Sequence, residues 1–414
     1  MIKGRTILCF ASGYDAPPTS KHHVMHLLAG DNTILWVNYH ASRRPGAGRR
    51  DLAHMADRLR RVLGGLVRAG KNLYVLTPLV VPLPGSAWAR RANRTLLSGQ
   101  IHKALTSVGG GPLQVWSFCP DVSYLLGRFR VERVLYYCVD DFASFSGYDR
   151  AQVTGDEADL CRRADLVVAS SKALYEAKLP LNERTIFVPH GVDFRHFAGA
   201  VWGDLPAPPD ICAIGRPRIG FFGLIRDWVD MDLVVAVARR RPQWQFVFLG
   251  DSAVDLSAFE ALANVHFLGA RPYRLLPNYC RHFDAAIIPF KINDLTRAVN
   301  PIKLREYLAA GLGVVSTPLP EVQAYGSLVE IADGPREFEA AVERVLHAGD
   351  EARRERAEAM RREAWPVKLQ EICERLMDGS KHAIGRMAEA QRERHPDTCV
   401  HSDGRPARRR GLDE

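Results

Sequence analysis

Short apolar runs alternate with helical segments along most of the chain. The runs in the first half cover residues 5–12, 33–39, 72–78, 113–118, 133–141, 164–171 and 185–193. The runs in the second half cover residues 218–223, 246–250, 265–269, 285–290, 313–317 and 328–332. Each run is almost continuously apolar, as is typical of strands that are buried on both faces of a parallel sheet. The alternation therefore predicts an α/β protein with two successive sheets, each covered by helices.

Composition changes sharply at two places, and these changes suggest domain boundaries. A stretch rich in Pro and Gly lies between the two sets of runs, and the last residues are polar and basic. A chain of 414 residues is long enough for two domains. We predict a first domain at 1–198, a linker at 199–217, a second domain at 218–365, a last helix at 366–378 and a disordered tail at 379–414. A ligand would bind in the cleft between the two domains.

The stretch NPIKLREYLAAGLGVVST, residues 300–317, predicts a short helix that leads into a buried strand. Asn300 is a suitable N-cap, and Pro301 suits the first helical position because its missing N–H has no partner to lose there. Gly311 would end the helix in the left-handed conformation.

Two charged residues of this helix suggest a binding site. Lys303 and Glu306 are three positions apart, so they share one face of the helix. Lys303 lies in the first turn, where free N–H groups and the helix dipole favour an anion. A cation beside such a helix end, followed by a carboxylate, suits the diphosphate and the sugar of a nucleotide sugar. The alternative is an amphipathic helix whose Lys303 and Glu306 face water.

The first strand is followed by a loop at 13–18 and a helix that residues 19–20 would cap. The dinucleotide fingerprint G-x-G-x-x-G is absent. His22 and His26 have the i, i+4 spacing of metal ligands, but no third ligand accompanies them. We therefore interpret His22 and His23 as part of a helix end that faces solvent or an acceptor.

Asp140 and Asp141 follow an apolar strand, at the edge of a parallel sheet where ligands bind. As neighbours on an extended chain their side chains point to opposite sides, which argues against a shared metal ion. A carboxylate at this place could take a proton from a reacting hydroxyl. The alternative is that Asp140 or Asp141 caps the next helix or turn. His190 is a candidate at the end of the first domain, or a histidine satisfied within its loop.

Basic residues gather in the first half of the chain, beside one tryptophan. They are Arg43, Arg44, Arg49, Arg50, Arg90, Arg91 and Arg94, with Trp88. The net charge of +9 makes an acidic partner plausible. Basic clusters with an interfacial tryptophan favour an anionic membrane surface, although a solvated basic face fits equally well. No nucleic-acid-binding motif is present, so we expect no nucleic-acid partner.

Location follows from what the sequence lacks. The N-terminus has too short an apolar run for a signal peptide, and no run of ~18 apolar residues could span a membrane. The eight cysteines are scattered without a C-x-x-C pair, as expected of reduced thiols. We predict a cytoplasmic protein, with peripheral attachment to the inner face of the plasma membrane as a further expectation.

Several blocks of sequence, taken in order, resemble a known family. They are HHVMHLLA, LYYCVDDFASF, ADLVVASS, FVPHGVDFRHF, RIGFFGLIRDWVDMDLVVAVARRRPQWQFVFLG, NVHFLGARPYRLLPNYCRHFDAAIIPF and NPIKLREYLAAGLGVVST. Together they resemble GT-B glycosyltransferases of the family-4 type, including bacterial teichuronic-acid and xanthan-type glucuronosyltransferases. The resemblance implies two Rossmann-like domains that face a cleft, and a C-terminal helix that crosses back to the first domain.

The resemblance also implies roles for residues of the donor half. Glu306 matches a glutamate that holds the nucleotide ribose, and Lys303 matches a lysine that contacts the diphosphate or a uronic-acid carboxylate. Gly223 begins a loop near the phosphates, and Arg226 is the nearest cation there. Asn300, at the helix start, would also lie at the donor.

In the first half, Asp140 matches the proposed base of the xanthan-type enzymes, with Asp141 beside it. His190 belongs to a block that matches the hinge, and His22 and His23 would lie on the acceptor side.

The chain also departs from the family pattern. Many family-4 enzymes carry E-x7-E, but Ala298 stands at the first position. Asp227 and Trp228 follow Arg226, where a lysine is usual. These differences put the retaining mechanism of that family in doubt and favour the glucuronosyltransferase-like branch.

These observations predict an enzyme that moves a sugar, with glucuronic acid as a candidate, from a UDP-linked or other nucleotide donor to a glycan or lipid-linked acceptor. The expected pathway is bacterial polysaccharide biosynthesis. Protein cations would stabilise the leaving diphosphate, so no metal and no other cofactor is expected. The alternatives are a sugar-nucleotide epimerase of similar fold and a non-catalytic sugar-nucleotide-binding protein.

Overall fold

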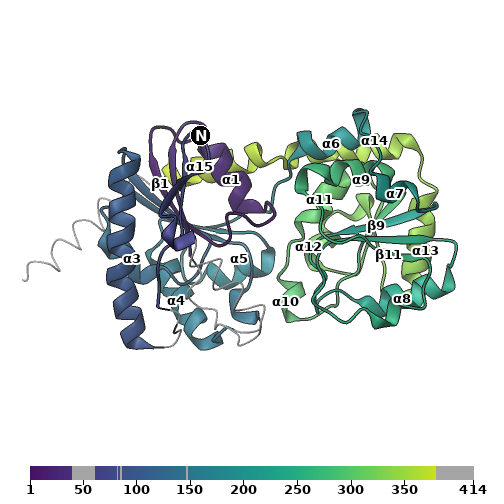
Figure 1. Ribbon diagram of the computed structural model, residues 1–414, viewed down its shortest axis with the longest axis horizontal. Helices are drawn as coiled ribbons and strands as arrows, with labels where there is room; N and C mark the ends of the chain where they lie inside the picture. Colours follow the sequence, from purple (N-terminus) through teal and green to yellow (C-terminus); the bar gives the residue numbers. More distant parts are fainter. Residues whose placement is uncertain (40–60, 82, 84–85, 146–147, 379–414) are drawn as a thin grey trace, which may run out of the picture. The chain divides into compact units, whose positions relative to one another are not determined.

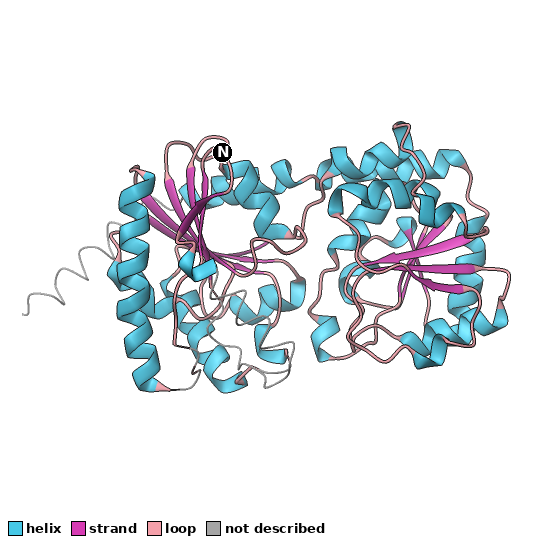
Figure 2. Cartoon of the chain, in the orientation of Figure 1, coloured by secondary structure: helices cyan, strands magenta, loops and turns pink. Residues whose placement is uncertain are grey.

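The computed structural model describes residues 1–39, 61–81, 83, 86–145 and 148–378. Contacts group Met1–Leu376 into one compact unit, which holds two sheets; of the second unit, Met377–Glu414, only the first two residues are described. We call the residues around the first sheet the first lobe and those around the second sheet the second lobe (Figures 1 and 2). The helix predicted from Asp51, the tail predicted at 379–414, and Arg43, Arg44, Arg49 and Arg50 lie outside the described residues.

The first lobe contains an eight-stranded sheet in the order β3-β4-β2-β1-β5-β6-β7-β8. Its strands are β1 (Thr6–Ala11), β2 (Thr33–Asn38), β3 (Leu66–Arg68), β4 (Leu73–Leu76), β5 (Leu113–Ser117), β6 (Arg133–Cys138), β7 (Leu166–Ala169) and β8 (Thr185–Phe187). Neighbouring strands are parallel except for β3, a short edge strand that pairs antiparallel with β4 and was not predicted.

Alternate residues of these strands enter two separate cores. Leu8 and Phe10 of β1 belong to the core on one face, whereas Ile7 and Cys9 belong to the core on the other face. Because both faces are covered, both sets of side chains are apolar, which explains the continuous apolar runs in the sequence.

The second lobe contains a six-stranded parallel sheet in the order β11-β10-β9-β12-β13-β14. Its strands are β9 (Arg218–Phe222), β10 (Gln245–Leu249), β11 (Val265–Phe267), β12 (Ala285–Ile288), β13 (Val314–Ser316) and β14 (Val329–Ile331). This order reverses direction between β9 and β12, and a doubly wound sheet binds its ligands at the carboxyl ends of the strands beside such a point. Both sheets therefore confirm the predicted α/β class.

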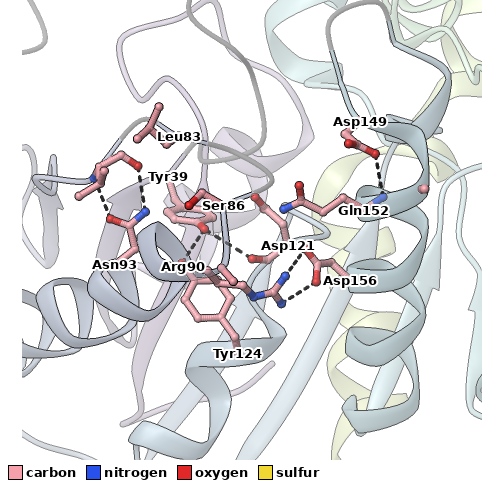
Figure 3. A pocket seen from close by; sticks show the side chains of 13 residues that line it. Tyr39, Leu83, Ser86, Arg90, Asn93, Asp121, Tyr124, Asp149, Gln152 and Asp156 are labelled. Atoms are coloured by element: carbon pink, nitrogen blue, oxygen red, sulfur yellow. Dashed lines mark hydrogen bonds and ion pairs between the residues drawn. The ribbon is translucent and has the colours of Figure 1, made fainter.

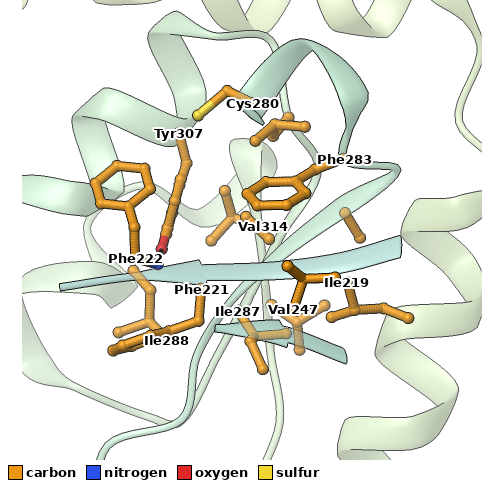
Figure 4. Close-up of a cluster of buried hydrophobic side chains, with 14 of the residues drawn as sticks. Ile219, Phe221, Phe222, Val247, Cys280, Phe283, Ile287, Ile288, Tyr307 and Val314 are labelled. Carbon is orange, nitrogen blue, oxygen red and sulfur yellow. Dashed lines mark hydrogen bonds between the residues drawn. The ribbon is translucent and has the colours of Figure 1, made fainter. Parts of the chain in front are cut away.

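Aromatic side chains fill much of the core of the second lobe (Figure 4). The rings of Phe222 and Tyr307 meet edge to face with their centres 4.6 Å apart, and the Tyr307 hydroxyl accepts a hydrogen bond of 2.8 Å from the backbone N–H of Phe222. These contacts join the end of β9 to the helix that the sequence singled out, because Tyr307 belongs to that helix.

The α-helices of the described part of the first lobe are α1 (Ser20–Leu28), α3 (Ala87–Val108), α4 (Arg150–Arg163) and α5 (Lys172–Lys178). The following helices are α6 (Phe194–Trp202), α7 (Pro209–Cys212), α8 (Met231–Arg240), α9 (Leu276–His282), α10 (Asp294–Arg297), α11 (Ile302–Ala309), α12 (Pro320–Gln323), α13 (Pro335–Leu346), α14 (Asp350–Ala359) and α15 (Trp365–Met377). Several start where the sequence provides an N-cap: the Asp149 and Asp230 carboxylates accept N–H groups of the first turns of α4 and α8.

The range predicted as a linker contains helical residues. α6 extends to Trp202, and α7 begins at Pro209. Ala200 of α6 and Ile211 of α7 lie in this range and are buried in the core of the second lobe. The reason is that Asp193 caps α6, so the helix continues into the range where we expected irregular chain. By its packing this range belongs to the second lobe.

Two chain segments pass between the lobes side by side. Val192 and Ala364 form a parallel bridge, in which Val192 N–H donates to Glu363 O at 3.0 Å and Trp365 N–H donates to Val192 O at 3.1 Å. After this crossing, α15 places Trp365 and Leu369 in a core of the first lobe. This confirms the C-terminal helix that returns to the first half of the chain.

Among the described residues, no helix combines the length and the apolar character needed to cross a bilayer. Seven cysteines are described; all are free, and Cys212 is the exposed one. The described part of the chain also contains no group of three or more His, Cys, Asp or Glu side chains arranged to hold a metal ion.

Candidate active site

A cavity of about 550 Å³ lies between the two lobes, and we call it the cleft. From the first lobe it is lined by residues that follow β1, β5 and β6, among them Lys21, Cys119 and Asp140. From the second lobe it is lined by residues that follow β9 and β10 and by the first turns of α11. Carboxyl ends of strands from both sheets therefore meet at one cavity, as expected of a ligand site in α/β proteins.

The start of α11 differs from our prediction. Pro301 is its N-cap, and Asn300 lies outside the helix. The Asn300 side chain donates to Ser170 O of the first lobe at 2.7 Å and to Glu321 Oε2 at 2.9 Å, and it accepts a 2.6 Å bond from Arg305. Arg305 is only 1% exposed, so its guanidinium needs buried hydrogen-bond acceptors. It takes the side-chain oxygen of Asn300, which as an N-cap would have accepted an N–H group of the first helical turn. Gly311, with a φ of 75°, ends the helix as predicted.

Lys303 reaches the cleft between two aromatic rings. Its ammonium lies 4.2 Å from the ring centre of Phe221 and 4.8 Å from that of Phe290. Burial lowers the pKa of Lys303 to about 7, although Glu306 nearby favours the charged form. A bound anion would restore the positive charge, because an opposite charge at close range stabilises the protonated amine.

Gly223 makes room for this lysine. Its φ of 128° is rare for residues with a side chain, and a Cβ built there would lie 2.8 Å from Lys303 Nζ. The end of β9 therefore needs glycine both for its backbone and for the space beside the ammonium.

Glu306 is buried one turn further along α11 and also lines the cleft. Burial raises the pKa of Glu306 to about 8, while Lys303 lowers it. The Tyr273 hydroxyl lies near the Glu306 carboxyl, where it lowers the pKa of that carboxyl, and it lies 3.5 Å from His23 Nε2 of the first lobe. A carboxyl in this position could accept hydrogen bonds from the hydroxyls of a ribose or, when protonated, donate one to them.

Asp140 and Asp141 have different surroundings. Asp140 lines the cleft, and burial raises its pKa to about 7, while Lys21 lowers it and Asp141 raises it. Asp141 does not line the cleft, and its carboxylate accepts a hydrogen bond from Ser144 Oγ. Asp140 is therefore the member of the pair that faces the cleft.

Lys21 was not predicted from the sequence. It lines the cleft near Asp140, and its ammonium donates to Ser12 Oγ at 2.8 Å. Burial lowers the pKa of Lys21, although Asp140 favours its charged form. The sequence feature that could have indicated Lys21 is its position in the first turn of the helix after the first strand, where a side chain faces the carboxyl edge of the sheet.

The predicted histidines are placed differently from one another. His190 lines the cleft and shares a 2.8 Å hydrogen bond with Ser20 Oγ. His22 accepts from Thr19 N–H at 3.1 Å and meets Tyr14 O at 3.0 Å, so both ring nitrogens serve the local fold. His23 stacks on Trp365 with ring centres 5.5 Å apart. Neither His22 nor His23 lines the cleft, so their acceptor role stays a prediction.

Two further predicted groups lie away from the cleft lining. Arg226 is partly buried but does not line the cleft, where Leu224 and Trp228 of the same loop are found. Arg90 binds both oxygens of Asp156, at 3.0 and 2.6 Å, so this arginine is engaged within the first lobe. Arg91 and Arg94 are exposed beside Trp88, which is 61% exposed.

The polar contacts of Glu321 predict a stability effect. One oxygen accepts the Lys172 N–H of the first lobe at 2.6 Å and the other accepts the Asn300 amide. Glu321→Gln leaves one acceptor for two donors, the buried Asn300 amide and the part-buried Lys172 N–H, so we expect a loss of about 1–3 kcal/mol in the free energy of unfolding. The measurement is the urea midpoint. Glu330→Gln, which removes an exposed partner of Arg344, should cost at most about 1 kcal/mol; equal shifts would contradict the argument.

Two doubly wound sheets with their strand ends at one cleft, and a crossing C-terminal helix, define the GT-B class of glycosyltransferases. The family described as "Glycosyl transferases group 1" matches residues 216–348. TuaH of Bacillus subtilis (strain 168), whose name assigns it as a glycosyltransferase of teichuronic acid biosynthesis, is 30% identical over 290 residues, which are 64% of this chain and 72% of that protein. The chain belongs to the group 1 glycosyltransferases of the family-4 type.

Solved structures share the fold. Sucrose-phosphate synthase from Thermosynechococcus elongatus has a TM-score of 0.63 at 14% identity, over 90% of this chain and 98% of that one. HepE from Anabaena, solved in complex with UDP and glucose, also has a TM-score of 0.63 at 14% identity, over 91% of this chain and all of that one. These likenesses confirm the GT-B fold that the sequence predicted.

Proposed function

We propose that this glycosyltransferase moves a sugar from a UDP-linked donor to a glycan or lipid-linked acceptor in bacterial polysaccharide biosynthesis. The observation that carries the donor side is the pair of Lys303 and Glu306 on the cleft-facing turns of α11, beside the switch point of the second sheet. The name of TuaH supports the polysaccharide pathway, and the complex of HepE with UDP and glucose supports the nucleotide.

The proposed reaction divides its work between the lobes. Lys303 and the free N–H groups at the start of α11 stabilise the negative charge that grows on the leaving diphosphate. Glu306 holds the ribose through its hydroxyls. Asp140, across the cleft, takes the proton from the acceptor hydroxyl as that oxygen attacks the sugar. With these protein groups in place, the proposed reaction uses no metal and no other cofactor.

Two finer assignments are part of the proposal. Glucuronic acid is the proposed donor sugar, because Lys303 could also contact a uronic-acid carboxylate. An anionic membrane surface is the proposed location of a lipid-linked acceptor, because Trp88, Arg91 and Arg94 are exposed together on the first turns of α3.

A thermal-shift screen of the full chain tests the donor. UDP and UDP-glucuronate should raise the midpoint of unfolding more than GDP and ADP sugars, because a ligand that binds only the folded state stabilises it by mass action. A response to GDP or ADP sugars alone would contradict the nucleotide assignment. If UDP-glucose raised the midpoint of unfolding as much as UDP-glucuronate did, the assignment of glucuronic acid as the donor sugar would be contradicted.

A further inference from the structure

A second pocket of about 450 Å³ lies in the first lobe, and none of its lining residues lines the cleft (Figure 3). Its walls come from Tyr39 after β2, from Asp121 and Tyr124 after β5, and from the first turns of α3 and α4. The volume is within the usual range for small-ligand sites, roughly 300–1,000 Å³. We call it the lobe pocket.

The lobe pocket is a close neighbour of the cleft. Cys119 lines the cleft, and Asp121, two residues further along, lines the lobe pocket. The Cys119 thiol also lies 3.6 Å from the backbone oxygen of Tyr39, a residue of the lobe pocket. The short segment after β5 therefore forms part of both walls, and an extended ligand could contact both cavities.

Its charges oppose an anionic ligand. Three carboxylates line it, from Asp121, Asp149 and Asp156, against a single arginine among the described residues of the wall. That arginine, Arg90, binds both oxygens of Asp156 and lies 5.0 Å from the ring centre of Tyr124. The start of α4 is capped by Asp149, which accepts the Gln152 N–H at 3.1 Å. Among the described residues of this wall, a phosphate or uronate would meet more carboxylates than cations.

Its polar groups suit hydroxyls. The hydroxyls of Tyr39 and Tyr124 bond each other at 2.8 Å. Gln152 Oε1 is buried and has no hydrogen-bond partner within the described structure, although buried acceptors are nearly always paired. Figure 3 shows the Gln152 side chain extending from α4 toward Asp121 and Ser86, across the pocket. Because this oxygen is covered in the structure, a ligand hydroxyl would supply the missing donor after the Gln152 amide turns toward the pocket.

We propose that the lobe pocket binds a neutral, hydroxyl-rich sugar unit of the acceptor, next to the unit that receives the transferred sugar. This proposal rests on the proposed function. It divides recognition of the acceptor into two parts: the cleft holds the reacting hydroxyl beside Asp140, and the lobe pocket reads the neighbouring sugar.

The test is saturation-transfer NMR on the full chain with saturating UDP, using methyl β-D-glucopyranoside as the neutral probe and methyl β-D-glucuronide as the anionic one. The glucopyranoside should show saturation transfer from the protein, and the glucuronide should show much less. Ala151 lines the pocket and is exposed, so Ala151→Trp fills the space with little risk to folding and should abolish the glucopyranoside signal. Ala359→Trp, at an exposed position of α14, is the matched control and should retain it.

A second variant removes the unpaired acceptor. Gln152→Leu should weaken glucopyranoside binding by about tenfold, since one hydrogen bond to a buried group is lost. The proposal would be overturned if the glucopyranoside showed no saturation transfer with the native chain, or equal saturation transfer with Ala151→Trp and Ala359→Trp. Failure of the native chain to bind UDP would instead overturn the donor assignment, and the two results are read independently.

Discussion

Asp140→Asn is expected to lower kcat for sugar transfer by about 10²–10⁴-fold, the usual contribution of a general base. The amide keeps the size of the carboxylate but cannot take the acceptor proton. Because Asp140 lies on the first-lobe side of the cleft and Lys303 and Glu306 on the other, the affinity for UDP should change little. The measurements are single-turnover transfer and UDP binding by calorimetry.

Asp141→Asn provides the matched control at the next position. Its carboxylate bonds Ser144 and does not line the cleft, so we expect a change in kcat of less than about tenfold. If Asp141→Asn lost as much activity as Asp140→Asn while both remained folded, the assignment of the base would be wrong.

The pH dependence follows from the burial of Asp140. Burial raises the pKa of this carboxyl to about 7, and only the ionised form is a base. kcat/KM should therefore have an acid limb near pH 7, the pKa of the Asp140 carboxyl in the free enzyme, while loss of the Lys303 proton limits it on the alkaline side. In Asp140→Asn this limb should be absent from the residual activity. If the acid limb persisted unchanged in Asp140→Asn, it would have to be assigned to another titrating group.

Lys303→Met is expected to weaken UDP binding by about 10–100-fold, because hydrogen bonds to charged groups contribute about 1.5–3 kcal/mol. Methionine keeps the apolar stem between the rings of Phe221 and Phe290, so the loss should report the charge. Lys291→Met, which removes an exposed lysine of the same lobe, is the control and should leave binding unchanged. Equal binding by Lys303→Met and the native chain would remove Lys303 from the donor site.

The same lysine predicts how binding varies with pH. Burial lowers the pKa of Lys303 to about 7 in the empty cleft, so the amine loses its proton as the pH rises above neutrality. An anionic donor needs the protonated form, so UDP binding above that pH should take up a proton. Calorimetry in buffers of different ionisation enthalpy measures this uptake, which should vanish in Lys303→Met.

The fold was predictable because its signal is repeated. Each strand except β3 is marked by an almost continuous apolar run, and thirteen separate runs all indicated parallel sheets covered on both faces. We did not predict the edge strand β3, because it has only three residues, at most one buried face and no continuous apolar run in the sequence. The helical residues within the range predicted as a linker were missed for a related reason: Pro and Gly suggested irregular chain, whereas Ala200 and Ile211 are buried in the core.

The site was predictable only in part. Helical spacing was enough to place Lys303 and Glu306 on one face, and the end of a strand was enough to bring Asp140 to the cleft. Asn300 shows the limit, because its role depends on Ser170 and Glu321, which are distant in sequence. Lys21 shows the same limit: a lysine in a first helical turn has no special pattern until the fold brings it near Asp140.

The return of α15 to the first lobe has a consequence for biosynthesis. Trp365, Leu369, Ile372 and Leu376 complete one face of a core whose other members lie between Ile2 and Val188 of the first lobe. On the ribosome the first lobe is therefore made first but finished last, after the whole second lobe has been translated, a delay of roughly ten seconds or more. During that interval the face under α15 stays uncovered, so we expect nascent chains that stop before Trp365 to be bound by chaperones and longer chains to be released from them.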